Sequence, residues 1–461
     1  MRVQPGKAPD TGHSALAAAV TANMDRFSVP GVAVGVLQNG ETWTVGFGVT
    51  NVDHPLPVTP DTLFQIGSIT KTVTCTAVMR LVEQGLIDLE APVRRYLPDL
   101  RLQDEDVAAR VTMRHLLTHT AGWLGDYFDD TGRGDDALRR IVERMAALPQ
   151  ISPLGSVYSY CNSGFYLAGR VIELVTGEPY ETAARRLVLE PLAMEQSFFL
   201  PEEVMIRRFG TGHLVVGGVP QVAEPWAVER STNPLGGLIS TVADLLRYAR
   251  FHMDDGTTPT GDRLLSAESI RVMQTPQVRG FYPLDHVGLT WRLKRVGPVQ
   301  TVSHGGATKG QQATFVMVPE RGFALALLTN ADQGGALGNE MTDWALEHYL
   351  GVKKPALTPL DVAPGDLVSY VGTYESPLSD RELSIQDGYL MLQLRPKGGF
   401  PSVDTPPGPT KPPVRMALWD EDRVVCLDDP MQGECGEFLR GPDGDVIAFH
   451  LGGRLSPRSA R

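Results

Sequence analysis

The spacing of apolar residues predicts a helix near the N-terminus, followed by a β-hairpin. Four apolar residues recur there at helical spacing: Leu16, Val20, Met24 and Phe27. Residues 31–38 and 41–49 are rich in alternating Val and Gly, which favours two strands. Asn39-Gly40 lies between them, and this dipeptide favours a type I′ turn. We therefore expect an amphipathic helix and then a hairpin.

Helical and extended patterns then alternate up to about residue 350. Helices are predicted over residues 68–84, 163–176, 241–251 and 341–350, and strands over residues 312–318 and 323–328. Gly85 and Gly177 follow two of these helices, at the position where a helix commonly ends. Residues 90–235 read as several helices joined by long loops. Strands at both ends of the segment, with helices between them, indicate an α/β sheet with a helical insertion.

A second domain is predicted after a linker at residues 353–366. Short strand-like runs separated by Gly and Asp turns follow at residues 370–374, 382–385, 389–394, 415–419, 424–427 and 446–451. This pattern is typical of a small all-β barrel or sandwich. Residues 396–413 contain seven prolines and are expected to form an irregular loop.

Charge and composition narrow the classes of partner. The chain has 461 residues, with 54 acidic and 42 basic side chains and a net charge of −12. Such a protein is not expected to bind nucleic acid, because phosphates attract a basic surface. No run of 18 apolar residues is present, so no transmembrane span is expected. The short apolar stretch near the N-terminus does not suit a secretion signal, which favours a cytoplasmic location, with a trimmed periplasmic or secreted form as the alternative.

Cysteine usage gives no disulfide framework. Four cysteines are too few for a disulfide-stabilised scaffold, so a reduced state is expected for all of them. Cys426 and Cys435 are close enough in sequence to form a pair, and this alternative stays open.

Ser68-Ile69-Thr70-Lys71 is the first candidate for chemistry. Ser68 stands at the start of a predicted helix, where free backbone N–H groups stabilise a developing negative charge. The i, i+3 spacing puts the Lys71 amine on the same face as the Ser68 hydroxyl. A lysine in a poorly solvated pocket can be neutral and accept the serine proton. Taken alone, the pattern also fits a helix-capping serine and a solvated lysine.

Two further motifs could face the same site. Tyr160-Cys161-Asn162 precedes the predicted helix at residue 163, and residues i and i+2 of an extended segment point the same way. Tyr160 could then transfer a proton, while Asn162 holds a substrate carbonyl or Lys71. The small residues in His304-Gly305-Gly306-Ala307 would let a substrate backbone approach closely. Each motif in isolation also fits ordinary packing or a Gly-rich turn.

Together, the motifs S-x-x-K, Y-x-N and H-G-G resemble the serine hydrolase superfamily of class C β-lactamases, penicillin-binding proteins and D-aminopeptidases. The resemblance covers roughly residues 14–350 and includes residues 64–98, 116–122 and 236–241. It implies a β-lactamase-like α/β fold, in which helices flank an antiparallel sheet and a helical subdomain occupies about residues 90–235. The catalytic domain would span residues 1–352. The all-β domain, residues 367–461, resembles the lipocalin-like barrels appended to some members.

The resemblance also implies catalytic roles. Ser68 would be the nucleophile and Lys71 the base of acylation. Tyr160 would pass a proton to the leaving group and, with Lys71, activate the deacylating water. His115 and His119 have the i, i+4 spacing of a metal pair, but no Glu follows His115 and the segment matches a structural loop of the family. No metal and no cofactor are expected.

The substrate-binding residues implied by the resemblance are Asn162, His304, Gly305, Gly306 and Ala307. The backbone N–H groups of Ser68 and Ala307 would form the oxyanion hole. His304 stands where β-lactamases carry a charged Lys, which puts recognition of a substrate carboxylate in doubt, since His changes charge near neutral pH. Cys161 takes the place of a common Ser or Ala and is expected to be a buried filler.

These expectations converge on a serine hydrolase that cleaves a small ester, amide or peptide bond, with peptides containing D-residues among the candidate substrates. A β-lactamase is the alternative activity. A penicillin-binding sensor that stays acylated is the alternative outside hydrolysis, and Tyr160 beside Lys71 argues against it. Assembly into a homo-oligomer is left open by the sequence.

Overall fold

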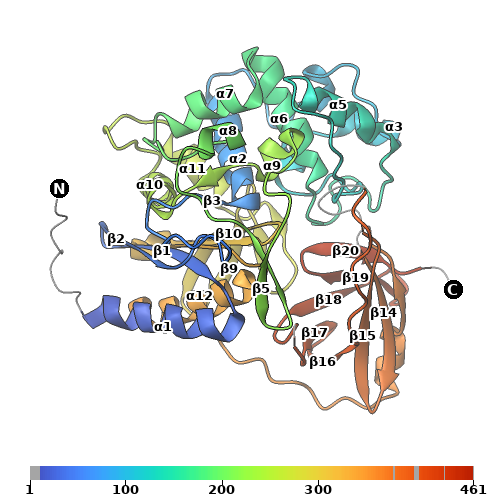
Figure 1. Cartoon of the computed structure of the whole chain (residues 1–461). Coiled ribbons are helices and arrows are strands. Elements are labelled where there is room, and N and C mark those ends of the chain that lie inside the picture. The colour runs from blue at the N-terminus through green and yellow to red at the C-terminus, as the bar shows by residue number, and fades with distance from the viewer. Residues whose placement is uncertain (1–10, 377–378, 399–403, 430, 460–461) are drawn as a thin grey trace.

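An antiparallel sheet of eight strands organises the chain up to residue 350 (Figure 1). In spatial order its strands are β2 (Glu41–Gly48), β1 (Gly31–Gln38), β12 (Phe323–Thr329), β11 (Gln311–Val318), β10 (Val299–Thr308), β9 (Arg292–Val296), β8 (His286–Val287) and β7 (Val278–Arg279). The computed structural model describes residues 11–376, 379–398, 404–429 and 431–459. Asn39 and Gly40 have φ values of 50° and 84°, as the predicted type I′ turn requires.

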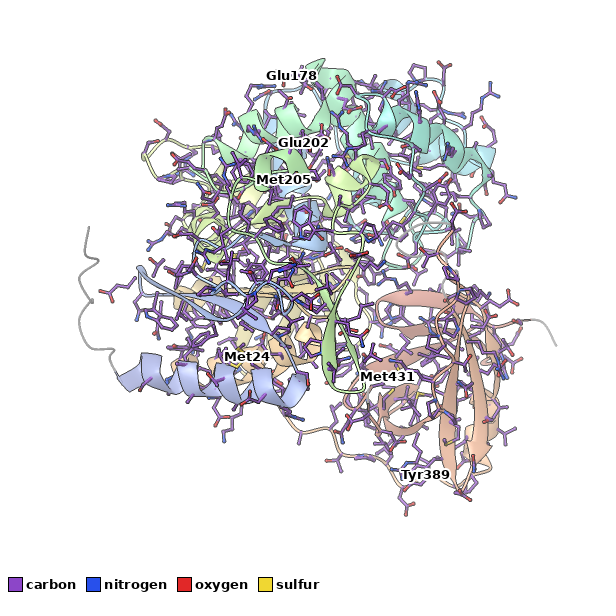
Figure 2. All side chains as sticks on the ribbon, in the orientation of Figure 1. Met24, Glu178, Glu202, Met205, Tyr389 and Met431 are labelled. Atoms are coloured by element: carbon purple, nitrogen blue, oxygen red, sulfur yellow. The ribbon has the colours of Figure 1, made fainter. Side chains whose placement is uncertain are left out.

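Helices cover both faces of this sheet. α1 (Thr11–Phe27) and α12 (Gly334–Leu350) pack on one face, and Met24 of α1 contacts the core there (Figures 1 and 2). α10 (Val242–Met253) packs against β1 and β12 on the other face. Val32 and Val34 belong to the core under α1 and α12, whereas Ala33 belongs to the larger core under α10. This alternation along β1 is the expected consequence of a strand buried on both faces.

The helical insertion lies above the sheet in Figure 1 and is largely apolar inside. Its helices are α3 (Glu105–Arg110), α4 (Met113–Leu117), α5 (Ala137–Arg144), α6 (Ser163–Thr176), α7 (Tyr180–Ala184), α8 (Pro201–Val204) and α9 (Asn233–Gly236). α2 (Thr70–Glu83) precedes the insertion and α11 (Ala267–Met273) follows it. Two small sheets accompany them, β3 (Phe64–Gln65) with β6 (Ile239–Ser240) and β4 (His213–Val216) with β5 (Val219–Val222). The β4–β5 hairpin lies in a segment that the sequence predicted to be helices and loops.

The start of β10 and the start of α12 differ from the sequence prediction. The strand that carries His304 begins at Val299, because β10 pairs with both β9 and β11 although its polar and glycine residues weaken the apolar pattern. α12 begins at Gly334 rather than at residue 341. A Cβ at position 334 would lie 1.7 Å from the Thr329 hydroxyl, so the start of this helix uses glycine for close packing.

The C-terminal region forms a second antiparallel sheet of eight strands that curls into a nearly closed barrel (Figure 1). Its strands are β13 (Gly372–Tyr374), β14 (Ser379–Gln386), β15 (Tyr389–Pro396), β16 (Val414–Asp420), β17 (Arg423–Cys426), β18 (Cys435–Arg440), β19 (Val446–Leu451) and β20 (Arg454–Pro457). An antiparallel bridge between Tyr374 and Arg458 joins the first strand to the last. β18 and β20 were not predicted, since one begins with a Cys-Gly-Glu run and the other is short and ends in Pro.

The structure also bears on the expectations for the cysteines and for a membrane span. All four cysteines are free and buried, so Cys426 and Cys435 do not pair. None of the helices in the described ranges is long and apolar enough to cross a membrane. Residues 399–403 of the proline-rich loop lie outside the described residues, and Lys411 farther along it accepts a hydrogen bond from Gln393 of the barrel at 2.8 Å.

Candidate active site

Ser68 and Lys71 meet at the start of α2. Ser68 lies in a 3-10 turn (η1, Gly67–Ile69) that leads into α2, rather than at the first position of the α-helix itself. The Lys71 Nζ atom is 3.0 Å from the Ser68 Oγ atom and donates to the Leu235 carbonyl at 2.6 Å. The Lys71 side chain is fully buried. Burial, followed by the charge of Arg454, holds the pKa of the Lys71 amine well below its ordinary value.

The H-G-G motif lies within β10 and packs directly on the turn that carries Ser68. A Cβ at Gly306 would lie 1.8 Å from the Ile66 carbonyl oxygen and 3.0 Å from the Ser68 backbone nitrogen. A Cβ at Gly67, whose φ is +51°, would lie 2.5 Å from the Ala307 backbone nitrogen. Both positions therefore exclude larger residues, and the close approach brings the backbone nitrogens of Ser68 and Ala307 to the same place.

Tyr160 lies beside Lys71. The Lys71 Nζ atom is 5.0 Å from the centroid of the Tyr160 ring, and His119 stacks on that ring at 4.4 Å. Burial raises the pKa of the Tyr160 hydroxyl to about 12, although Arg292 and the neighbouring Ser68 act to lower it. The hydroxyl forms no hydrogen bond of ordinary geometry within the described residues. It is thus a protonated group close to Ser68 without a competing partner.

Asn162 and His304 complete the set of predicted side chains. The Asn162 Nδ2 atom donates to the Asp126 Oδ1 atom at 2.6 Å. The His304 Nδ1 atom lies 2.6 Å from the Gly305 carbonyl, which can only accept, so Nδ1 carries the ring proton. The His304 Nε2 atom is then an acceptor, buried and without a partner among the described residues. Burial, followed by the charge of Arg292, holds the pKa of His304 well below its ordinary value, so the ring is neutral.

Comparison with known proteins identifies the family of the chain. A sequence profile of the Beta-lactamase family matches residues 16–350, which contain every predicted site residue. The chain belongs to the Beta-lactamase family. Within this family it is a serine hydrolase with the β-lactamase-like fold that the sequence predicted, followed by a C-terminal barrel.

Relatives and solved structures similar to this chain carry several different names. Penicillin-binding protein 4 of Amycolatopsis lactamdurans is 37% identical over 356 residues, 75% of this chain and 93% of that protein. SurE, solved with D-Leu, superposes with a TM-score of 0.74 at 27% identity and covers 97% of this chain and 99% of its own. The D-amino acid amidase of Ochrobactrum anthropi SV3, solved with L-phenylalanine amide, has a TM-score of 0.62 at 26% identity and covers 73% of this chain and 99% of its own. Hydrolysis of ester and amide bonds fits the names of relatives that include this amidase and Esterase EstB of Burkholderia gladioli, which is 35% identical over 170 residues, 34% of this chain and 43% of that protein.

Four residues around this site were not found by sequence reasoning as contributors to it. Two are guanidinium groups that flank the Tyr160 ring, with Arg454 at 4.8 Å and Arg292 at 5.5 Å from its centroid. The others are Asp126, which holds Asn162, and His119, whose Nδ1 accepts from the Cys161 backbone N–H at 3.0 Å. The sequence placed His119 in a structural loop of the family, but nothing local marks the other three. Cys161 is buried, as predicted, and burial raises its thiol pKa to about 11.

Proposed function

We propose that Ser68 is the nucleophile and that Lys71, in its neutral form, is the base that removes the serine proton. The observation that carries this proposal is the 3.0 Å contact between the Lys71 amine and the Ser68 hydroxyl, made by an amine that is fully buried. A buried lysine with a lowered pKa is neutral over more of the physiological pH range and can accept a proton. The Ser68 oxygen then attacks the substrate carbonyl and forms an acyl-enzyme.

Tyr160 is the group that we assign to protonation of the leaving group. Its pKa of about 12 keeps the hydroxyl protonated, and it lies next to both Ser68 and Lys71. The Lys71 amine, after taking the serine proton, can return it through Tyr160 to the leaving amine or alcohol. In deacylation the same two groups would activate water. The proton is therefore conserved over one turnover.

The binding groups follow from the third motif and from Asn162. The backbone N–H groups of Ser68 and Ala307 would stabilise the oxyanion, since the packing of β10 on η1 brings them together. Asn162 would orient a substrate carbonyl. Its Nδ2 atom donates one hydrogen to Asp126 and retains a second hydrogen that can be donated to the substrate. His304 and Gly305 would line the same side. A neutral His304 offers no charge to a penicillin carboxylate, which favours amide, peptide and ester substrates over β-lactams.

For the substrate we infer a small amide, ester or peptide that contains a D-residue. The names of two structural relatives support this inference, since one was solved with D-Leu and the other is a D-amino acid amidase. A cytoplasmic location also belongs to the proposal. Assembly into a homo-oligomer stays open, and light scattering of the purified protein measures it.

The test of the nucleophile is covalent labelling combined with turnover. A fluorophosphonate should add once to the intact protein, on the peptide that contains Ser68, and Ser68→Ala should abolish both labelling and hydrolysis of D-aminoacyl p-nitroanilides. Loss of a serine nucleophile costs on the order of 10⁶ in kcat. Ser369→Ala, on the exposed side of the barrel, is the matched control and should label normally. An adduct on another residue, with Ser68→Ala fully active, overturns the assignment.

The same panel separates the alternative activities. Turnover of nitrocefin that exceeds turnover of anilides and p-nitrophenyl esters would identify a β-lactamase. A single stoichiometric burst with penicillin and no turnover of any substrate would identify a sensor. The proposal expects steady turnover of anilides or esters, with D-configured substrates preferred over their L-configured counterparts.

A further inference from the structure

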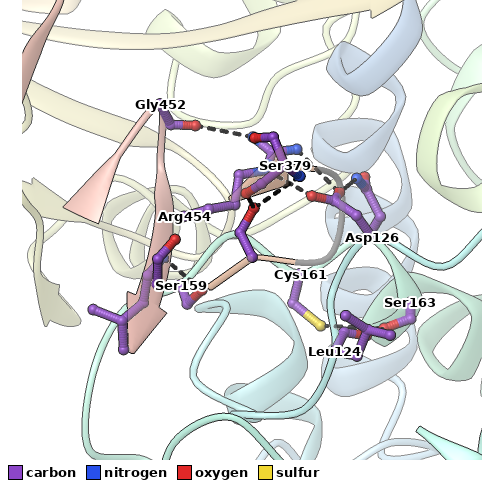
Figure 3. Close-up of polar contacts among 12 residues, drawn as sticks. Leu124, Asp126, Ser159, Cys161, Ser163, Ser379, Gly452 and Arg454 are labelled. Atoms are coloured by element: carbon purple, nitrogen blue, oxygen red, sulfur yellow. Dashed lines mark hydrogen bonds and ion pairs between the residues drawn. The ribbon is translucent and has the colours of Figure 1, made fainter. Parts of the chain in front are cut away.

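The turn between β19 and β20 of the C-terminal barrel lies against the Y-x-N motif (Figure 3). The Tyr160 backbone N–H donates to the Gly453 carbonyl at 2.9 Å. The Leu455 backbone N–H donates to the Ser159 hydroxyl at 3.2 Å. The position of a Cβ at Gly453 would be 3.7 Å from the Tyr160 Cβ atom. The barrel thus contacts the backbone of a motif about 290 residues earlier in the sequence, as the span of 296 between Ser159 and Leu455 shows.

An ion pair extends this contact to the side chains of the site. Arg454 Nε and Nη2 donate to the two carboxylate oxygens of Asp126 at 2.8 and 3.1 Å (Figure 3). Asp126 in turn accepts from Asn162 Nδ2 at 2.6 Å. The Asp126 side chain is 3% exposed, and the Arg454 guanidinium lies 4.8 Å from the centroid of the Tyr160 ring. Arg454 of the barrel therefore acts on both functional side chains of Y-x-N: it binds Asp126, which holds Asn162, and it flanks the Tyr160 ring.

We propose that Asp126 and Arg454 are positioning residues of the active site, and that the barrel completes this site by fixing Asn162 and the Tyr160 backbone in their working geometry. The proposal rests on the function proposed above for Ser68 and Asn162. It adds that the residues of the family domain are insufficient for full activity. Arg454 acts through Asp126 and Asp126 acts through Asn162, so neither needs to touch the reacting atoms.

The chemistry of an amide side chain explains why such a device is useful. An asparagine has a donor and an acceptor end of nearly the same shape, but only the donor end can hydrogen-bond a substrate carbonyl. An ionised carboxylate only accepts, so Asp126 holds the Nδ2 end of Asn162 and excludes the flipped orientation. Burial acts to raise the pKa of Asp126, but the charge of Arg454 and the hydrogen bonds from Arg454 and Asn162 outweigh it and lower that pKa. Arg454 thereby keeps Asp126 ionised.

A positioning role predicts a kinetic effect of both partners. We expect Asp126→Asn and Arg454→Gln each to lower kcat/KM for the best substrate by about 10- to 100-fold, the range that small misplacements near a reacting centre produce. The effects should not add in the double variant, because both substitutions break the same contact. Arg454→Lys keeps the charge but loses the bidentate geometry and should restore part of the activity.

The pH dependence provides a readout that a merely structural contact would not move. Near Lys71, the Asp126 charge raises and the Arg454 charge lowers the pKa of the amine, and Arg292 and Cys161 also act on it. Asp126→Asn should therefore move the acid limb of the kcat/KM profile to lower pH, and Arg454→Gln should move it to higher pH. The limb of the double variant should lie between those of the single variants. His119 and His304 also face this cluster, and burial holds the pKa of both rings well below the ordinary value.

A second ion pair between the barrel and the catalytic region supplies the matched control. Arg279 of β7 pairs with Glu437 of β18, and its side chain is 61% exposed. Arg279→Gln should change kcat/KM by less than twofold and leave the acid limb in place. Thermal melting and circular dichroism of each variant check that the fold is retained, and Arg454→Lys serves where Asp126→Asn does not fold.

Two outcomes would overturn the inference. One is a folded Asp126→Asn or Arg454→Gln variant with kcat/KM and acid limb equal to those of the unaltered protein. The other is equal damage by Arg279→Gln, which would show that any loosening of the barrel suffices. Fluorophosphonate labelling distinguishes these from a failure of the proposed function. If Ser68 is labelled and the variants show normal kinetics, only the positioning role is refuted. If another residue is labelled, the assignment of Ser68 as the nucleophile is refuted.

Discussion

Replacing Lys71 with methionine tests the charge of this amine through its effect on stability. Methionine has a similar length, fills a buried site and does not titrate. Burial, followed by the charge of Arg454, holds the pKa of Lys71 well below the ordinary value of 10.5. Between the folded and unfolded pKa values, the unfolded chain binds one more proton than the folded chain. The free energy of unfolding therefore rises with pH in this window and falls as the pH is lowered.

The magnitude follows from one proton. A single group contributes up to about 1.4 kcal/mol per pH unit across such a window. We expect the difference between the unfolding free energies of the unaltered protein and Lys71→Met to rise by up to about 2.7 kcal/mol from pH 7 to pH 9. Urea unfolding followed by tryptophan fluorescence at several pH values measures this difference. Contributions from groups that titrate alike in both proteins cancel in it.

The control for this experiment is Lys411→Met. Lys411 is exposed on the proline-rich loop, so its amine is in water in the folded and unfolded chains alike. The stability of this variant should follow the pH dependence of the unaltered protein. If Lys71→Met also follows it, with a constant difference across the pH range, Lys71 is charged in the folded chain and the reasoning that makes it a base fails.

Three further substitutions or measurements test other parts of the site. Gly306→Ala should lose at least 100-fold in kcat/KM and about 1–3 kcal/mol of stability, because its Cβ would lie 1.8 Å from the Ile66 carbonyl oxygen. Gly305→Ala is the control: its Cβ would lie 3.6 Å from the nearest atom, so its thermal melt should be close to normal. His304→Gln should lower kcat/KM but keep the acid limb of the pH profile, since the pKa of His304 is far below neutrality and its ring does not titrate there. A maleimide should label four thiols in the denatured, unreduced protein, and a count of two would show a disulfide.

The sequence was sufficient for the parts of the fold whose residues are neighbours along the chain. The Asn39-Gly40 turn, the stop at Gly177 and the apolar stripe of α6 all depend on local propensity and spacing, and all appear in the structure. The short distance between Ser68 and Lys71 also follows from i, i+3 spacing alone. β10 was predicted less well, because its glycines carry no strand signal. In the structure these glycines allow β10 to approach η1 closely.

The contribution of the barrel was beyond the reach of the sequence for a physical reason. Arg454 stands in a Gly-Gly-Arg turn that reads as an ordinary hairpin end, and Asp126 stands in a loop among other polar residues. Their proposed role follows from a salt bridge between residues that are 328 positions apart in the sequence. This salt bridge forms only when the two eight-stranded sheets dock against each other. Neither hydrophobic periodicity nor motif spacing encodes that docking.

The charges around Tyr160 give the proposed role of Arg454 a second physical basis. Proton exchange between Lys71 and Tyr160 is easiest when their pKa values are close, yet burial moves the pKa of the lysine down and that of the tyrosine up, which favours a neutral lysine and a protonated tyrosine. Arg292 and Arg454 flank the ring and act to lower both pKa values, so they stabilise a tyrosinate as it forms while keeping the amine neutral. The charge of Asp126 acts against that of Arg454 at Lys71, where it raises the pKa of the amine. In the mechanism proposed above, Arg454 of the barrel would therefore act on the reaction through its charge near Tyr160 as well as through the position of Asn162.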